Sequence, residues 1–224
     1  MPVTDVRFTA NGLSLAGRLH VPDAKGPHPV IVVSHGFSVL RAMGLDDYCA
    51  RFAAAGFACL AYDHRNFGES EGLPRHEIDP WQQVADTRDA ISFVRTLPGV
   101  DPERVGLWGT SFSGGHAIVV AALDRRVKCV VSQVPLIAGF DTLLSWVGAE
   151  NLPKMIQRFN DDRDARYRGT APNPRGRATR PGSGWRRSGR KSCTRTRSPS
   201  AASRISRATS PGSTSSGWRR RRSS

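Results

Sequence analysis

The stretch "VGLWGTSFSGGHA", residues 105–117, decides the fold. A short apolar run leads into Gly-Thr-Ser-Phe-Ser-Gly-Gly, and a segment of helical character follows. This order is typical of a strand that turns sharply into a helix and exposes a serine hydroxyl on the turn. We therefore predict that Ser111 is a nucleophile, in preference to the alternative that the segment is a flexible loop rich in glycine and serine.

Strands and helices alternate on both sides of this stretch. Alternating apolar and polar residues around Asn11-Gly12 predict a β-hairpin over residues 3–22. Buried strands are predicted at 29–36, from 57, at 104–109 and at 127–135, and helices at 45–55, at 81–97 and from 114. This alternation predicts an α/β fold with a mostly parallel sheet and helices on both faces. Ligands bind at the carboxyl ends of such strands, so we expect the chemistry in the loops that follow them.

Three of those loops carry a resemblance. They are His35-Gly36-Phe37, the segment from Asp63 to Ser70, and the segment from Gly109 to Gly115. In this order, residues 1–168 resemble an α/β-hydrolase, and within that superfamily the dienelactone hydrolase and Xaa-Pro peptidase (S15) branch of serine hydrolases. The resemblance implies the α/β-hydrolase fold. It also implies hydrolysis of a small ester, thioester or amide-like acyl substrate through an acyl-enzyme.

The resemblance also assigns roles near the serine. It implies an oxyanion hole built from the backbone amides of Phe112 and Phe37, and a structural role for His35 and Gly36 in ordering the oxyanion loop. Gly109 is a structural position of the turn. Ser113 stands where the motif G-x-S-x-G has its last glycine, which is a minor departure because serine is small. Asp63 and Arg65 are implied to make structural hydrogen bonds, and no metal or other cofactor is expected.

The general base is missing from the predicted site. In this fold the acid and the histidine follow the serine in the chain. Yet His116 is the last histidine, and no Asp or Glu follows residue 164. His116 comes five residues after Ser111, so we expect helical geometry to direct its side chain away from the nucleophile. Asp141, the acid closest after the strand at 127–135, is retained as a candidate catalytic acid.

The last quarter of the chain differs in composition from the rest. Residues 1–165 hold 16 Lys and Arg against 19 Asp and Glu, whereas residues 166–224 hold 17 Lys and Arg and no acid. After about residue 170 there is no periodicity and hardly any aliphatic residue, so we expect disorder. We therefore divide the chain into a partial hydrolase domain at 1–168, with the start of a cap region at about 140–168, and a basic tail at 169–224.

Three interpretations of the tail remain open. It is an arginine-rich module that binds nucleic acid or another anionic surface non-specifically, a solvated linker, or the product of a frameshift near residues 169–175 in a GC-rich gene. The frameshift accounts at once for the lost acids, the lost aliphatic residues and the missing histidine, so we favour it. On that hypothesis the fold is incomplete, the sheet has an open edge, and the chain has little or no turnover.

Other features concern compartment and burial. The N-terminus lacks the pattern of a signal peptide, and no apolar run is long enough to span a bilayer. We therefore expect a soluble, cytoplasmic chain without a membrane partner. Three cysteines in apolar runs are expected to be free and buried, and three histidines are expected at the surface: Cys49, Cys59, Cys129, and His20, His28, His76.

Overall fold

A computed structural model describes residues 1–170 of the 224-residue chain. The predictions for the basic tail, namely disorder, anion binding and a frameshifted origin, fall almost entirely on residues outside this range. Within residues 1–170, no helix is long and apolar enough to cross a membrane.

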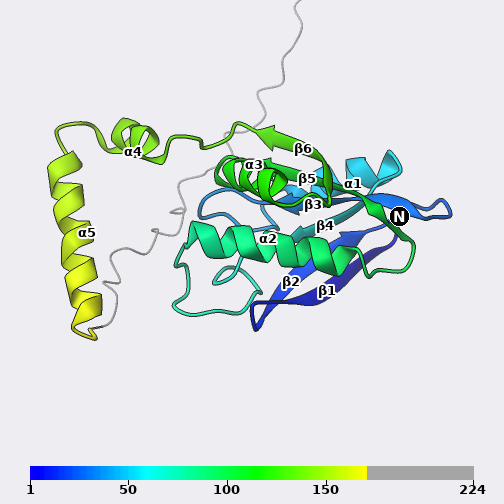
Figure 1. The fold of residues 1–224 in the computed structure, drawn as a ribbon, viewed down its shortest axis with the longest axis horizontal. Helices are drawn as coiled ribbons and strands as arrows, with labels where there is room; N and C mark the ends of the chain where they lie inside the picture. Colours follow the sequence, from blue (N-terminus) through cyan, green and yellow to red (C-terminus); the bar gives the residue numbers. More distant parts are fainter. Residues whose placement is uncertain (171–224) are drawn as a thin grey trace, which may run out of the picture. The chain divides into compact units, whose positions relative to one another are not determined.

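Six strands form one mixed sheet in the order β1-β2-β4-β3-β5-β6 (Figure 1). The hairpin strands β1 and β2 are antiparallel, and β2 joins β4 in antiparallel orientation, while β4, β3, β5 and β6 run parallel. Their bounds are β1 Val3–Ala10, β2 Leu13–His20, β3 His28–Ser34, β4 Ala58–Tyr62, β5 Val100–Thr110 and β6 Val127–Gln133. The predicted hairpin and the mostly parallel α/β sheet are confirmed.

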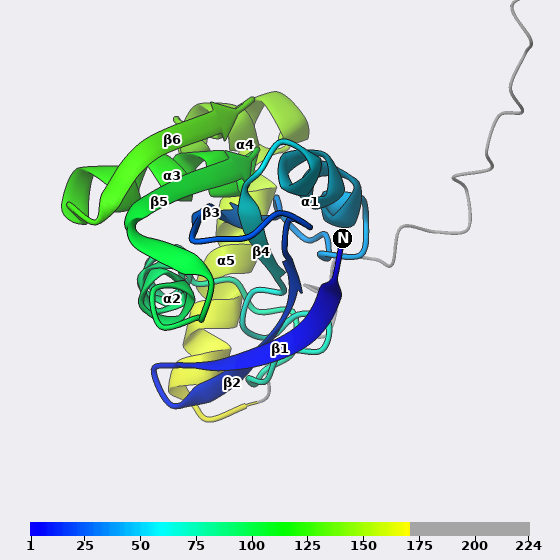
Figure 2. The same cartoon turned by 90° about the vertical axis from the view of Figure 1, so that its right-hand side faces the viewer.

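Helices connect the parallel strands and cover both faces of the sheet (Figure 2). α1 packs on one face, and α2 and α3 pack on the other. The helices are α1 Leu45–Ala54, α2 Pro80–Val94, α3 Phe112–Leu123, α4 Gly139–Val147 and α5 Leu152–Tyr167. Residues 140–168, where the start of a cap region was expected, thus contain two helices. The first ends at Gly148, whose φ of 81° takes the chain out of the helix.

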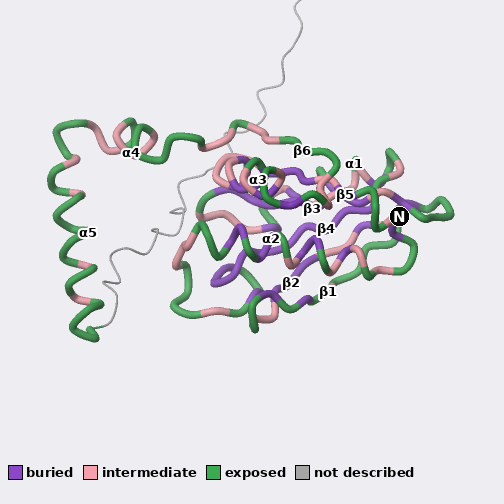
Figure 3. The backbone as a smooth tube through the Cα atoms, in the orientation of Figure 1, coloured by how far each residue is buried: buried purple, intermediate pink, exposed green. Residues whose placement is uncertain are grey.

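The apolar core is divided by the sheet into two clusters. The larger cluster joins the hairpin and the sheet to α2 and α3, and includes Leu15, Leu60, Ile91 and Val120. The smaller cluster joins the other face to α1 through residues such as Cys49 and Trp108. Buried backbone therefore runs through the central strands (Figure 3). Burial on both faces explains why these strands have continuous apolar runs rather than alternating ones.

The last strand differs from the buried strand that its sequence predicted. β6 pairs with β5 on one side only among the described strands, and residues 128–131 are exposed. Cys129 is exposed with them, which corrects the expectation that this thiol is buried. α4 and α5 likewise contain no buried residue, and this part of the tube in Figure 3 is mostly green and pink. An apolar run indicates a strand, but it does not reveal how many layers cover that strand.

The connections reverse direction at the centre of the sheet. From β3 the chain crosses to β4 on one side, and later continues through β5 and β6 on the other. The ends of β3 and β5 are adjacent, with Ser34 paired with Gly109. Such a switch point leaves a crevice at the carboxyl ends of the strands. It places the loop that begins at His35 beside the turn that contains Ser111.

Candidate active site

Ser111 occupies the turn between β5 and α3 in a strained backbone conformation. Its φ of 54° and ψ of −116° lie outside the regions that L-residues favour. Both of its backbone polar groups are held by the end of β6 and the loop that follows it. The Ser111 amide donates to the Gln133 carbonyl at 2.8 Å, and the Leu136 amide donates to the Ser111 carbonyl at 2.9 Å. The tertiary structure therefore fixes the conformation that the turn would not hold on its own.

Two glycines allow the backbone to approach closely at this turn. A Cβ atom on Gly109 would lie 2.1 Å from the Ser113 carbonyl oxygen, so any side chain there would collide with the backbone of α3. A Cβ atom on Gly36 would lie 3.2 Å from the Ser111 Cβ and 3.7 Å from the Ser111 Oγ. The loop after β3 is thus packed directly against the serine side chain.

The two amides expected to form the oxyanion hole belong to the residues that follow Ser111 and Gly36. Phe112 is the first residue of α3, and the first amides of a helix have no acceptor within the helix. Phe37 follows Gly36, and its ring packs edge-on against that of Phe112 with centroids 5.6 Å apart. Trp146 of α4 lies 6.2 Å from Phe37. No motif in the sequence indicated that Trp146 would reach this site.

His35 is buried, and both of its ring nitrogens are engaged. Its Nδ1 lies 3.0 Å from the Gly36 carbonyl oxygen, which can only accept, so Nδ1 carries the proton. Its Nε2 then accepts the amide hydrogen of His64 at 3.1 Å. Burial lowers the pKa of His35 below its usual value, in keeping with this neutral form. A histidine held in this way fixes the start of the loop after β3 and has no nitrogen left to take a proton from Ser111.

Two more buried histidines lie near the turn. The His64 Nε2 is 2.8 Å from the Ser113 Oγ, so Ser113 is more than a small residue in a crowded turn. The His116 ring packs against the Phe112 ring with centroids 4.5 Å apart. Neither nitrogen of His116 has a hydrogen-bond partner within residues 1–170, Ser111 included. Burial lowers the pKa of His116 to about 4 and that of His64 well below its usual value.

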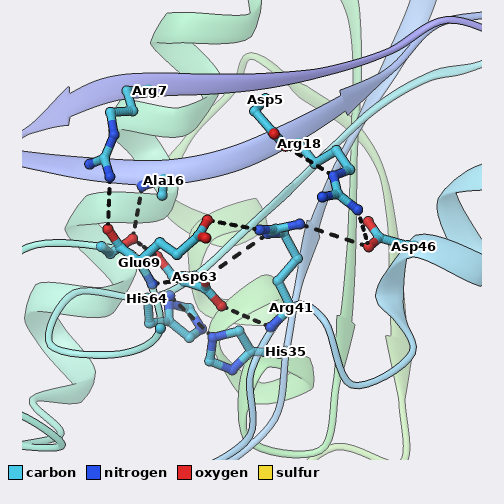
Figure 4. Close-up of polar contacts among 12 residues, drawn as sticks. Asp5, Arg7, Ala16, Arg18, His35, Arg41, Asp46, Asp63, His64 and Glu69 are labelled. Carbon is cyan, nitrogen blue, oxygen red and sulfur yellow. Dashed lines mark hydrogen bonds and ion pairs between the residues drawn. The ribbon is translucent and has the colours of Figure 1, made fainter.

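The loop after β4 is hydrogen-bonded to His35 and Arg41, which flank the loop after β3 (Figure 4). The Asp63 carboxylate accepts the Arg41 amide at 2.9 Å and the Glu69 amide at 3.3 Å, while the Ser70 hydroxyl donates to the Asp63 carbonyl at 2.6 Å. The Arg41 guanidinium lies between carboxylates, 3.3 Å from Glu69 and 3.8 Å from Asp46. Asp63 thus joins its own loop to the segment after the oxyanion loop.

The other half of the same loop faces α2. The Arg65 guanidinium pairs with the fully buried Asp86 carboxylate through two nitrogens, with Nε at 2.6 Å from one oxygen. Neither Asp63 nor Arg65 is hydrogen-bonded to Ser111. Their bonds to Arg41 and Asp86 hold the loop after β4 in place.

The candidate acid and two histidines lie where they make no contact with the nucleophile. Asp141 is exposed in the first turn of α4 and has no histidine partner among residues 1–170. His20 and His28 are buried, which corrects the expectation that they lie at the surface. The His20 Nε2 lies 3.2 Å from Asp46, and the His28 Nε2 lies 2.9 Å from the Ala24 carbonyl. The partner of His20 comes from α1, 26 positions along the chain, so it could not be inferred from the residues around this histidine, whereas the partner of His28 lies four positions before it.

A cavity of about 140 Å³ adjoins the site. Its polar wall contains His35, Gly36, Thr110 and Gln133, and its apolar wall comes from the segment before α1, from α1 and from Trp108. Within the described part of the chain, no group of three or more His, Cys, Asp or Glu side chains is placed to hold a metal ion.

The strand order, the strained serine between β5 and α3, and the loop packed against it define an α/β-hydrolase. The family model of the X-Pro dipeptidyl-peptidase (S15) family matches residues 11–222. The chain belongs to this family of hydrolases, as the resemblance implied. The frameshift hypothesis places the end of the family sequence near Gly169. The matched range runs past that position and marks no boundary there.

Three relatives illustrate the similarity. The chain is 44% identical over 135 residues to the thiohydrolase aneE of Aspergillus aculeatus, covering 60% of this chain and 42% of that protein. It is 42% identical over 141 residues to the quorum-quenching protein AidA of Acinetobacter baumannii, covering 63% and 46%. The crystal structure of the α/β hydrolase GrgF from Penicillium has a TM-score of 0.68 at 32% identity, covering 77% and 57%. The chain spans about half the length of the curated relatives it matches.

Proposed function

We propose that this chain is a hydrolase of small ester or thioester substrates, with Ser111 as the nucleophile and the Phe112 and Phe37 amides as the oxyanion hole. One observation carries the proposal. Ser111 is held at φ 54° between β5 and α3, with Gly36 placed so that an added Cβ atom would lie 3.2 Å from the Ser111 Cβ. Strain of this kind is kept where a function requires it. The thiohydrolase name of the relative aneE supports a thioester among the possible substrates.

The proposed chemistry is acyl transfer. The Ser111 Oγ attacks the acyl carbon and gives its proton to water, and the bond to the leaving group breaks as that group takes up a proton and departs as a thiol or alcohol. Water then hydrolyses the acyl-enzyme and releases the acid. Negative charge develops on the acyl oxygen in both steps, and each oxyanion donor stabilises that charge by about 3 kcal/mol.

We further propose that the 224-residue chain itself turns over slowly. His35 uses both nitrogens, His64 is bonded to Ser113, and His116 makes no hydrogen bond to the serine. None of these three buried histidines is therefore placed to act as the base. An enzyme that lacks a triad member retains only the part of its rate enhancement that comes from the oxyanion hole and from binding, about 10³- to 10⁴-fold over water.

Covalent labelling tests both parts of the proposal. The chain is treated with a fluorophosphonate probe, and turnover of a butyryl thioester is measured in parallel. We expect slow stoichiometric labelling that maps to Ser111 and disappears in S111A, with thioester hydrolysis close to background. Labelling that persists in S111A would disprove the role of Ser111. Fast hydrolysis that depends on Ser111 would disprove the slow turnover.

The origin of the tail has its own test. The nucleotide sequence that encodes residues 165–224 is read in all three frames. A continuous alternative frame that encodes an aspartate and a histidine supports the frameshift, and stop codons in both alternative frames reject it.

A further inference from the structure

We propose that Ser113 and His64 are positioning residues that connect the nucleophile turn to the oxyanion loop, a role that rests on the proposed function of Ser111 and Phe37. The three loops of the site come from the ends of three different strands, and a hydrolase needs the serine and the oxyanion donors in a fixed relation. Ser113 and His64 supply that connection through hydrogen bonds.

The connection is a continuous path of three hydrogen bonds. It starts at the Ser113 Oγ on α3 and reaches the His64 Nε2 at 2.8 Å. From the backbone of the same residue, the His64 amide donates to the His35 Nε2 at 3.1 Å. The His35 Nδ1 then donates to the Gly36 carbonyl at 3.0 Å. Gly36 lies against the Ser111 side chain, so the path begins and ends beside the nucleophile.

Protonation states along the path are mutually consistent. The Gly36 carbonyl requires a proton on the His35 Nδ1, and the His64 amide requires a lone pair on the His35 Nε2. In His64 the Nδ1 is buried and has no partner among the described residues. A buried N–H without an acceptor is rarer than a buried acceptor without a donor. We therefore assign the proton of His64 to Nε2, which donates to the Ser113 hydroxyl.

Burial gives these bonds their effect. Ser113 is completely buried and His64 is 1% exposed, so water cannot replace either partner. The rings of His35 and His64 also touch, with centroids 4.4 Å apart. A shift of the His64 ring therefore moves the ring that holds the Gly36 carbonyl.

Asp63 makes a second hydrogen bond between the loop after β4 and the segment that contains the oxyanion loop. Asp63 precedes His64 and accepts the Arg41 amide at 2.9 Å. Asp63 and His64 are consecutive residues of the loop after β4, and they hold both ends of the segment that contains the oxyanion loop. His64 bonds to His35 at the start of this segment, and Asp63 bonds to Arg41 beyond it. Ser113 fastens His64 to α3, which a glycine at this position could not do.

The test compares S113A with S132A in the full chain. Ser132 is a matched control because its hydroxyl also bonds to α3, donating to the Gly114 carbonyl at 2.8 Å, without touching His64. Two quantities are measured: the rate of fluorophosphonate labelling at Ser111, and the NMR signals of the Gly36 and Phe37 amides and of the His35 and His64 ring nitrogens. H64Q is the conservative variant, since a glutamine amide can reach the Ser113 hydroxyl.

We expect S113A to slow labelling about tenfold to a hundredfold, the size of effect that a misplaced reacting group produces. We also expect it to move the Gly36, Phe37 and His64 signals, while S132A leaves both measurements near those of the unmodified chain. H64Q should retain most of the labelling rate. Equal labelling rates and unmoved Gly36 and Phe37 signals in S113A would overturn the positioning role.

The proposed nucleophile is tested separately by S111A. If S111A labels like the unmodified chain, the proposed function fails. The NMR signals alone then decide whether Ser113 holds the oxyanion loop: movement in S113A but not in S132A supports the connection, and the absence of movement rejects it.

Discussion

The loops around Ser111 and the segment from β6 to α5 differ in how deeply their residues are buried. Around the serine, the loops after β3 and β4 contain buried residues such as His35, Asp63 and His64 that are hydrogen-bonded between the two loops. From β6 onward, no residue of the strand or of the two helices is buried. The difference teaches that the buried side chains around Ser111 come mainly from elements that precede β6. The end of β6 and the loop after it contribute as well, because Gln133 and Leu136 hold the backbone of Ser111.

The largest expected difference between the two regions is in the free energy of unfolding that is lost when a carboxylate is removed. Asp86 is fully buried against Arg65, whereas Asp162 on the exposed α5 pairs with Arg166 at 2.8 Å. Asp86→Ala leaves a buried guanidinium without its partner and should lower the free energy of unfolding by about 3–5 kcal/mol. Asp162→Ala should change it by less than about 0.5 kcal/mol. Urea unfolding measures both, and a similar loss in the two variants would contradict the comparison.

Two isoleucines on helices give the next contrast. Ile91 on α2 is 0% exposed and Ile156 on α5 is 44% exposed. Ile91→Ala should cost about 2–5 kcal/mol through lost burial and the cavity it leaves. Ile156→Ala should cost less than about 0.5 kcal/mol, because little apolar surface returns to water. Thermal and urea unfolding of the pair would show whether α5 packs more tightly in solution, since a large effect at Ile156 requires it.

The third prediction concerns how stability depends on pH through His116, the last histidine in the chain. Its pKa is about 4 in the folded protein and about 6.5 when unfolded. The unfolded chain therefore binds a proton first as the pH falls, so stability is full above about pH 6.5 and declines between pH 6.5 and 4. From pH 7 to pH 5 the loss attributable to His116 is about 2 kcal/mol.

Urea unfolding at the two pH values gives the total loss, to which His35 and His64 also contribute because their pKa values are lowered by burial. His116→Gln should be less pH-dependent than the unmodified chain by about 2 kcal/mol. An unchanged pH dependence would mean that His116 is not a buried neutral group.

The smallest expected effect concerns helix caps. The Asp79 side chain accepts the Trp81 and Gln82 amides at the start of α2, whereas Asn151 at the start of α5 makes no such bond. Asp79→Ala should cost about 1 kcal/mol, and Asn151→Ala should cost only a few tenths. A larger cost at Asn151 would reveal a cap that forms in solution.

Local pattern was sufficient for the elements and for the motifs. The hairpin at Asn11-Gly12, the buried run that became β3, and the helix at 81–97 each depend on neighbours in sequence, and each was predicted within a few residues. The glycines beside Ser111 were also recognisable, because the turn that they allow is local. Residue spacing likewise predicted that His116 would not bond to Ser111.

Burial and partnership were decided by the tertiary structure. β6 and β3 have similar apolar runs, yet one is exposed at an edge and the other is buried, because coverage depends on elements distant in the chain. His20 and His28 were expected at the surface for the same reason.

The bond between His64 and Ser113 spans 49 positions of sequence, so no local pattern could predict it. By itself, the sequence determined that a serine would stand on a sharp turn in an α/β fold. Only the folded chain decided what holds that serine against the oxyanion loop, since hydrogen bonds between loops form where separate strands end side by side.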